Sequence, residues 1–283
     1  MICDQPFFVH NGESPVYPVI ISVPHAGRHY PQTIQQALRV PLYAVRALED
    51  RYADALAQLC IAAGFPTIIA QVPRLMIDLN RAPDDHEYTH ASHVTVQSHA
   101  RPLNLRAMQG LGVVPTRLGH VGALWRDRPT LAVIQGLVKG YHTPYHEMLH
   151  TLLWRTRRKF GCAILLDLHS MPSLGHGPQL VFGDRQGESA GALIRRRALE
   201  AVSGSGFRVG LNTPYAGGYT LARHGQPAYN IHAVQIEVDR ALYLDAQGAK
   251  PSSALPGLQE LIHGVACALS DCAARFEWLS AAE

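Results

Sequence analysis

The stretch Ala163-Ile-Leu-Leu-Asp-Leu-His169-Ser-Met-Pro172 decides the fold class of this 283-residue chain. Its apolar residues have the pattern of a buried strand, and small and turn-forming residues follow at once. Ligands of open α/β sheets lie just beyond the carboxyl ends of the strands. We therefore expect His169, at the end of this strand, to take part in metal or acid–base chemistry.

Three further segments repeat this arrangement, with polar side chains at or near the end of an apolar run. They are Tyr17–Gly27 with His25, Leu75–Arg81 with Asn80 and Arg81, and Ala233–Arg240 with Glu237. Two imidazoles, one arginine and one carboxylate are then expected at one edge of one sheet. An active site explains this repetition, whereas a structural protein has little reason for it.

Strands and helices alternate along the rest of the chain. Strands are expected at about 18–23, 66–72, 75–79, 162–168, 179–182 and 233–239, and helices at about 42–63, 129–158, 188–203 and 255–279. This alternation predicts an α/β fold, with a mostly parallel sheet between helices on both faces. With 47% hydrophobic residues, the chain can bury the core of a single catalytic domain over residues 1–283.

Residues 82–127 depart from the alternation, since they are polar and rich in histidine and turns. No Ser/Gly or charged tract flanks them, so we interpret them as a loop-rich excursion over the active site and not as a linker. The excursion contains His86-Glu-Tyr-Thr-His90, which matches the HExxH zinc motif. That motif requires a stable helix, whereas the neighbouring proline, β-branched and small polar residues favour a loop.

Composition argues against several classes of protein. The 25 basic and 22 acidic residues give a net charge of +3, and the arginine clusters are typical of solvated helix faces, so no nucleic-acid partner is expected. There is no run of 18 apolar residues and no signal-peptide pattern, so no membrane partner is expected and a cytoplasmic location is the default. Five scattered cysteines form no CxxC pair. The 16 histidines suit a metal or proton-transfer enzyme, and no oligomeric state is predicted.

Six blocks of sequence, spread in order over nearly the whole chain, together resemble the N-formylglutamate amidohydrolase family. The blocks are Ser22–Gly27, Asp50 with Asp54, Ile77–Arg81, Asp167–Ser170, Asn212–Tyr219 and Gln235–Glu237. The Asp-Leu-Asn-Arg and Asp-Leu-His blocks are also similar to those of aspartoacylase and, more distantly, of the zinc carboxypeptidases. The resemblance implies a three-layer α/β/α sandwich around a mixed sheet and one catalytic zinc ion (Zn2+), although the sequence does not fix the identity of the divalent metal.

A catalytic zinc ion needs about three protein ligands and one open position for water. His25 and His169 are expected to supply two of these ligands. In the deacylases and carboxypeptidases a Glu ligand follows the first His by three residues, but Arg28 occupies this position here. The third ligand must therefore come from another part of the chain.

Asp50 is the residue that we expect to be this third ligand, within the predicted helix at 42–63. Glu49 and Asp54 are the alternatives. Asp54 lies one helical turn beyond Asp50, so it could share the same helix face and support the ligand from behind. A solvated helix carboxylate remains the competing interpretation of Asp50.

Glu237 is the expected catalytic base. It is a lone carboxylate in an apolar strand, where loss of solvent would raise its pKa toward the value that a general base needs. The competing interpretation is a buried ion pair between Glu237 and Arg240. Zinc-bound water ionises near neutral pH, so the base and the metal would act together on an amide carbonyl.

Substrate recognition is assigned first to Arg81 and Asn80. The planar guanidinium of Arg81 can bind a carboxylate through two hydrogen bonds. A structural ion pair of Arg81 with Asp78 or Asp84 is the alternative.

Further residues are expected around the substrate. Arg126 and Arg223 are candidates for a second substrate carboxylate. Gly218, in a Gly-Gly turn, would let the backbone approach a ligand closely, although turn geometry alone explains the glycine nearly as well.

The predicted function is a metal-dependent amidohydrolase whose partner is a small-molecule N-acyl amino acid. By resemblance it removes a formyl group from an acidic amino acid, as in N-formylglutamate. The alternatives are a related zinc deacylase or carboxypeptidase acting on other N-acyl amino acids or short peptides, and a metal- or ligand-binding protein without catalysis. The presence of Glu237 argues against the last alternative, because a binding protein has no use for a base.

Overall fold

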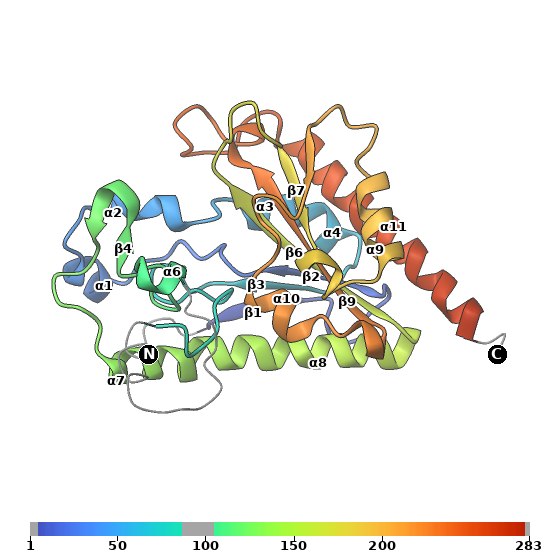
Figure 1. Ribbon diagram of the computed structural model, residues 1–283, viewed down its shortest axis with the longest axis horizontal. Helices are drawn as coiled ribbons and strands as arrows, with labels where there is room; N and C mark the ends of the chain where they lie inside the picture. Colours follow the sequence, from blue (N-terminus) through green and yellow to red (C-terminus); the bar gives the residue numbers. More distant parts are fainter. Residues whose placement is uncertain (1–4, 87–104, 281–283) are drawn as a thin grey trace.

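The computed structural model describes residues 5–86 and 105–280, in which a seven-stranded mixed sheet lies between two layers of helices (Figure 1). The strands are β1 (Phe7–His10), β2 (Val19–Val23), β3 (Thr67–Ala70), β6 (Ala163–Met171), β7 (Leu180–Gly183), β8 (Val209–Leu211) and β9 (Ile231–Asp239). Their order across the sheet is β1-β3-β2-β6-β9-β7-β8. The predicted α/β class with a mixed, mostly parallel sheet is confirmed, and it is consistent with the carboxypeptidase-like fold that the resemblance implies.

The central strands β3, β2, β6 and β9 are parallel, whereas β1 and β7 run antiparallel to their neighbours β3 and β9. Parallel strands bring their carboxyl ends to one edge of a sheet, where ligands bind. The register pairs His169 of β6 with Glu237 of β9, and Asp167 of β6 with Ser22 of β2. Polar side chains from three strands therefore lie at the same edge.

Helices cover both faces of this sheet (Figure 1). One face packs on α8 (Thr143–Phe160) and α10 (Tyr219–His224), and α7 (Leu131–Leu137) with the π-helical turn η4 (Val138–His142) leads into α8. The other face packs on α3 (Ala53–Leu56), α4 (Gln58–Ala62), α9 (Ala192–Glu200) and α11 (Leu255–Ser280). Among the described helices none is both long enough and apolar enough to cross a membrane.

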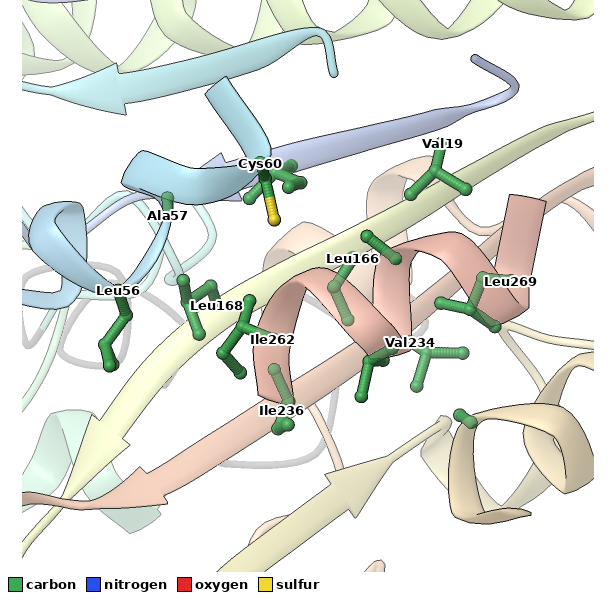
Figure 2. Packing of buried hydrophobic residues seen from close by; sticks show 14 of the residues in the cluster. Val19, Leu56, Ala57, Cys60, Leu166, Leu168, Val234, Ile236, Ile262 and Leu269 are labelled. Atoms are coloured by element: carbon green, nitrogen blue, oxygen red, sulfur yellow. The ribbon is translucent and has the colours of Figure 1, made fainter. Parts of the chain in front are cut away.

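The alternation of side chains along β6 selects the face on which the polar residues lie. Ile164, Leu166 and Leu168 are in the core on the α11 side, and Figure 2 shows the last two beside Ile262 of α11. Residues at the other positions, such as Leu165, are in the core on the α8 side. Because strand side chains alternate with a period of two, Asp167 and His169 are directed toward the α8 side.

The continuous helix predicted at 42–63 is wrong. The segment is divided into α2 (Leu42–Val45), η1 (Arg46–Leu48), α3 and α4. Tyr52 has a φ of 60°, and the N–H of Asp50 donates to the carbonyl of His25 at 3.1 Å. A tertiary hydrogen bond therefore replaces the helical one, and Asp50 lies at a break between helices and not within a helix.

The strand predicted at 75–79 is also wrong. The N–H groups of Met76 and Ile77 donate to the carbonyl of Pro73 in a turn, and the N–H of Asp78 donates to Val113. Leu75 to Ile77 are almost fully buried, so the apolar run reflects burial in the core on the α8 side and not strand pairing. The short strands β1 and β8, at the two edges of the sheet, and the short helix α10 were not predicted.

The excursion predicted at 82–127 is only partly described. Residues 87–104, with Glu87 and His90 of the HExxH match, lie outside the described residues. The described part contains α6 (Leu105–Met108) and a ribbon of β4 (Arg117–Leu118) and β5 (Gly122–Ala123). The loop-rich character of the whole segment and its place over the active site stay predictions.

Candidate active site

His25, Asp50 and His169 form a buried triad at the carboxyl edge of the sheet. The Nδ1 atoms of His25 and His169 lie 3.2 Å and 3.1 Å from Oδ2 of Asp50. One ligand atom from each residue lies within 4.8 Å of the other two. The structure thus brings together the three residues that were predicted as metal ligands, at a spacing that one ion can bridge.

The second nitrogen of each histidine is held by a carboxylate. Nε2 of His25 lies 2.7 Å from Oδ1 of Asp78, and Nε2 of His169 lies 2.9 Å from Oδ2 of Asp167. Histidines that bind metals almost always donate their other N–H to such a partner, which fixes the tautomer and the orientation of the ring. Both Nδ1 atoms are therefore directed toward a common point.

Asp167 is itself fixed by a buried chain of hydroxyl groups. The Ser22 hydroxyl donates to Oδ1 of Asp167 at 2.6 Å, and the Tyr145 hydroxyl lies 2.9 Å from Oγ of Ser22. Tyr145 belongs to α8, so this helix supports the site from behind. The orientation of His169 consequently depends on residues from β2, β6 and α8.

The electrostatics of the triad favour a positive charge. Burial opposes ionisation of Asp50, but hydrogen bonds from His169 and His25 outweigh it and hold the pKa of Asp50 well below its usual range. Burial also opposes the charged form of His169, yet Asp167 and Asp50 raise the pKa of His169 well above its usual range. A divalent cation between the two Nδ1 atoms and Asp50 would supply positive charge there, and a set of two imidazoles and one carboxylate fits such an ion.

The two alternatives for the third ligand have other partners. Glu49 is buried and accepts a hydrogen bond from the Tyr30 hydroxyl at 2.6 Å. Asp54 accepts two hydrogen bonds from Arg28, at 2.6 Å and 2.8 Å. The prediction that Asp54 shares a helix face with Asp50 and supports it is wrong, because the helix is interrupted between them.

Arg240 binds the side of Asp50 that faces away from the histidines. Its Nη2 donates to Oδ1 of Asp50 at 2.9 Å, and its Nε donates to the Ser170 hydroxyl at 2.9 Å. These contacts leave Oδ2 of Asp50 directed toward the two Nδ1 atoms. They also contradict the alternative in which Arg240 forms an ion pair with Glu237.

Glu237 lies beside the triad on the neighbouring strand, opposite His169 in the register. Its side chain is nearly buried, and Nε2 of Gln235 donates to its Oε1 at 3.0 Å. Burial raises the pKa of Glu237 to about 7, although the positive charge of His169 acts in the opposite direction. Two nearby carboxyl groups, Glu237 and Asp50, thus have pKa values shifted in opposite directions, which is typical of an acid–base site.

Asn80 connects the triad to the turn that contains Gly218. Its Nδ2 lies 3.4 Å from Nε2 of His169, and its Oδ1 accepts a hydrogen bond from the N–H of Thr220 at 2.9 Å. A Cβ atom at Gly218 would lie 2.4 Å from Oδ1 of Asn80. The close approach that this glycine permits is therefore to Asn80.

Arg81 follows Asn80 and is directed toward two acidic residues. Its Nε lies 3.9 Å from Oδ2 of Asp78, and its Nη1 lies 3.9 Å from Oδ2 of Asp85. Both distances exceed that of a hydrogen bond. Since Asp78 holds His25, the guanidinium of Arg81 lies close to the residues that support the triad.

Arg126 and Arg223 both lie at the surface. Nε of Arg126 donates to the carbonyl of Gln36, in α1 (Gln32–Ala37), and Nη1 of Arg223 donates to the hydroxyl of Tyr219. These contacts connect Arg126 to α1 and Arg223 to its own helix α10. The structure does not bring either residue into the triad, and their role in substrate binding stays a prediction.

Arg74 was missed by sequence reasoning. Its Nε donates to Oδ2 of Asp78 at 2.8 Å, and its positive charge acts on both Asp50 and Glu237. Arg74 falls between the strands expected at 66–72 and 75–79, and no role was predicted for it. A basic residue four positions before Asp78, at the start of a block that ends in Asn-Arg, was the available signal.

A cavity of about 480 Å³ borders the site on the side of Arg240. Arg46, Arg51 and Arg240 line it, so its wall is cationic. None of the triad residues lines this cavity, and the pair between Arg240 and Asp50 connects its wall to the site.

Comparisons with known proteins agree with this geometry. Residues 17–244 match the family model described as N-formylglutamate amidohydrolase. The chain is 30% identical over 242 residues to N-formylglutamate deformylase of Pseudomonas aeruginosa, covering 81% of this chain and 83% of that one. It is 29% identical over 255 residues to N-formylglutamate deformylase of Pseudomonas putida, covering 86% of each. The crystal structure of N-formylglutamate amidohydrolase from Ralstonia eutropha has a TM-score of 0.84 at 25% identity, covering 95% of this chain and 99% of that one.

Proposed function

This chain belongs to the N-formylglutamate amidohydrolase family, and we propose that it is a metal-dependent deformylase that hydrolyses N-formylglutamate to formate and glutamate. The observation that carries the proposal is the triad of His25, Asp50 and His169, whose ligand atoms all lie within 4.8 Å of one another. The carboxylates behind both histidines support it, because they engage each Nε2 and leave each Nδ1 directed toward Asp50, where an ion would bind.

The triad would hold one divalent ion, with zinc favoured by two imidazoles and one carboxylate. When bound, such an ion supplies a water molecule of lowered pKa and polarises the carbonyl oxygen of the amide. Asp78 and Asp167 keep the two imidazole rings in the required orientation. Arg240 holds Asp50 so that only its Oδ2 is directed toward the histidines.

Glu237 takes the proton from the attacking water and later donates it to the leaving amine nitrogen. Its pKa near 7 suits both steps, because the group can accept and release a proton near neutral pH. Gln235 fixes the Oε1 atom of Glu237, which limits the rotation of the carboxylate.

Arg74 stabilises the negative charge that develops on the carbonyl oxygen. Its guanidinium lies close enough to Asp50 and Glu237 for its charge to act on both, and Asp78 fixes its Nε. A preorganised cation of this kind stabilises the transition state more than the ground state.

Arg81 and Asn80 bind the remainder of the substrate. Glutamate carries two carboxylates, and the guanidinium of Arg81 can donate two parallel hydrogen bonds to one of them. Asn80 lies beside Nε2 of His169, and its Oδ1 is held by the N–H of Thr220, so Arg81 follows a residue that is fixed next to the triad.

The test is release of formate from N-formylglutamate by the purified protein, compared with release of acid from N-acetylglutamate and from N-formylglutamine. The proposal predicts the highest kcat/KM for N-formylglutamate. A higher kcat/KM for an N-acyl amino acid without the second carboxylate would favour the related deacylase, and no amide hydrolysis at all would favour a binding protein.

A further inference from the structure

Three consecutive carbonyl groups, those of Leu79, Asn80 and Arg81, are each held by a different donor. Nε2 of His146 donates to the carbonyl of Leu79 at 2.8 Å, and Nε2 of His142 donates to that of Arg81 at 2.8 Å. The backbone N–H of Tyr219 donates to the carbonyl of Asn80 at 3.3 Å. Residues 79–81 belong to no strand or helix themselves, so these long-range contacts help to fix their position.

The two histidines come from successive turns of one helical stretch. His142 ends the π-helical turn η4, and His146 follows one turn later in α8. Their rings lie 4.4 Å apart, and Tyr219 packs against both. A π-helical turn is rare and often occurs at functional sites.

His146 is in turn fixed by a third histidine. Its Nδ1 lies 2.9 Å from Nε2 of His224, the last residue of α10. Because Nε2 of His146 already donates to Leu79, a neutral His146 accepts at Nδ1, and His224 must then be the donor. The hydrogen bonds therefore specify the tautomers of both rings.

Both ends of helix α10 help to hold the segment from Leu79 to Arg81. At its start, the N–H of Thr220 donates to the side chain of Asn80, and at its end His224 holds His146. The chain from Leu79 to Arg81 is thus held by α8 on one side and by α10 on the other.

These three histidines are buried and remain neutral, which suits fixed hydrogen bonding. Their side chains are at most 2% exposed. Burial lowers the pKa of His142 and of His146, and it lowers the pKa of His224 to about 3. They lie behind the segment that carries Arg81 and take no part in the proton transfers described above.

We propose that His142, His146 and His224 form a histidine clamp, whose function is to position Asn80 and Arg81 for binding the substrate carboxylate. The inference rests on the proposed function, in which Arg81 binds that carboxylate. Activity is sensitive to the position of such binding groups, because a displacement of about 1 Å can reduce it by roughly 100-fold. The clamp residues are positioning residues, since they hold the backbone and not the substrate.

His142→Leu, His142→Gln and the control His150→Leu test this inference. Leucine removes the donor to the Arg81 carbonyl, whereas the amide of glutamine can replace Nε2. His150 lies one turn further along α8 and is exposed, with its ring against Trp154. The measurements are kcat and KM for N-formylglutamate, calorimetric binding of L-glutamate, and hydrogen exchange of the amides from Asn80 to Ala82.

His142→Leu should raise KM by at least about tenfold while kcat changes by less than about threefold, because uniform binding is lost and the chemical step is retained. It should also weaken L-glutamate binding and accelerate exchange in this segment. His142→Gln should restore all three properties toward wild type, and His150→Leu should change none. If His142→Leu does not fold, His142→Asn takes its place, since its shorter amide does not reach the carbonyl.

Failure of the inference differs from failure of the proposed function. A wild-type protein that does not hydrolyse N-formylglutamate contradicts the proposed function, and L-glutamate binding then carries the test of the clamp. The inference is overturned if the wild type and the folded variant without the His142 donor bind L-glutamate with equal affinity. It is also overturned if neither of them binds L-glutamate. A loss of kcat with unchanged KM in that variant overturns the inference as well.

Discussion

Nε2 of His25 lies 2.7 Å from Oδ1 of Asp78, while Nδ1 of the same ring faces Oδ2 of Asp50. One carboxylate thus orients the imidazole for a bond that its other nitrogen can make. Asp78 also binds Nε of Arg74, and its pKa lies well below its usual range: burial opposes ionisation, but Arg74 and His25 outweigh it. It is therefore an ionised carboxylate at the centre of the site.

Asp78→Asn should reduce the affinity for the metal by roughly 10- to 100-fold, the usual effect of removing such a partner. The amide keeps the shape but loses the charge that favours the donor form of His25. Affinity is measured by competition with a chelator. Asp54→Asn serves as the control, because Asp54 binds Arg28 and should leave the affinity unchanged. Equal affinities for the two variants would show that Asp78 does not act on the ion.

Glu237→Gln should lower kcat by roughly 100- to 10,000-fold, since it removes proton transfer and preserves shape. Metal content and the melting temperature should stay close to those of the wild type. Both are measured beside the rate of formate release. Near-normal turnover would show that Glu237 is structural, and the search for the base would move to the histidines of the excursion.

The pH dependence of kcat/KM should report Glu237. Burial raises its pKa to about 7, and a base must be deprotonated, so activity should fall as the pH falls through and below this value. A bound cation stabilises the carboxylate, which moves the break to pH 7 or lower. The plot of log kcat/KM against pH should have a slope of about 1 on its acid side. The same acid limb in the residual activity of Glu237→Gln would assign it to another group.

Arg81→Lys should lower kcat/KM for N-formylglutamate by at least about tenfold, or about 1.4 kcal/mol of transition-state binding. An ammonium group is a point charge and lacks the planar fork that grips a carboxylate. The loss should be much smaller for an analogue whose carboxylate is converted to an amide. Equal losses on both substrates would mean that Arg81 supports the fold or acts on the carbonyl.

Residues that lie in or directly after strands could be predicted from the sequence. His25, His169 and Glu237 follow from apolar runs that end in polar residues, because parallel strands bring their ends to one edge. Asp50 was also expected as the third ligand, but it was expected within a helix and not at a break between helices. It reaches the triad through a break in the helix, and periodicity carries no signal for such a break.

The residues behind the site could not be predicted in the same way. His142 ends η4 and His146 lies in α8, both far from Leu79 and Arg81 in the sequence, and their spacing is that of any helix face. Arg74 lies in a turn, whereas the apolar run that follows it predicted a strand. Each of these contacts depends on how a helix or a turn packs against the sheet, which local patterns do not encode.

The identity of the third ligand can be tested by substitution. Asp50→Ala should lose the metal, as His25→Ala and His169→Ala should, whereas Glu49→Ala and Asp54→Ala should retain it. Elemental analysis of the five purified variants measures this. Retention of metal by Asp50→Ala together with its loss from Glu49→Ala or Asp54→Ala would reassign only the third ligand.

The most direct measurement is a titration of chelator-treated protein with zinc, in which bound metal and the rate of formate release from N-formylglutamate are followed together. A metal-dependent deformylase should show no turnover without metal, a rate that rises in proportion to bound zinc, and saturation at about one ion per chain. Full turnover by protein that contains no bound metal would contradict this metal dependence.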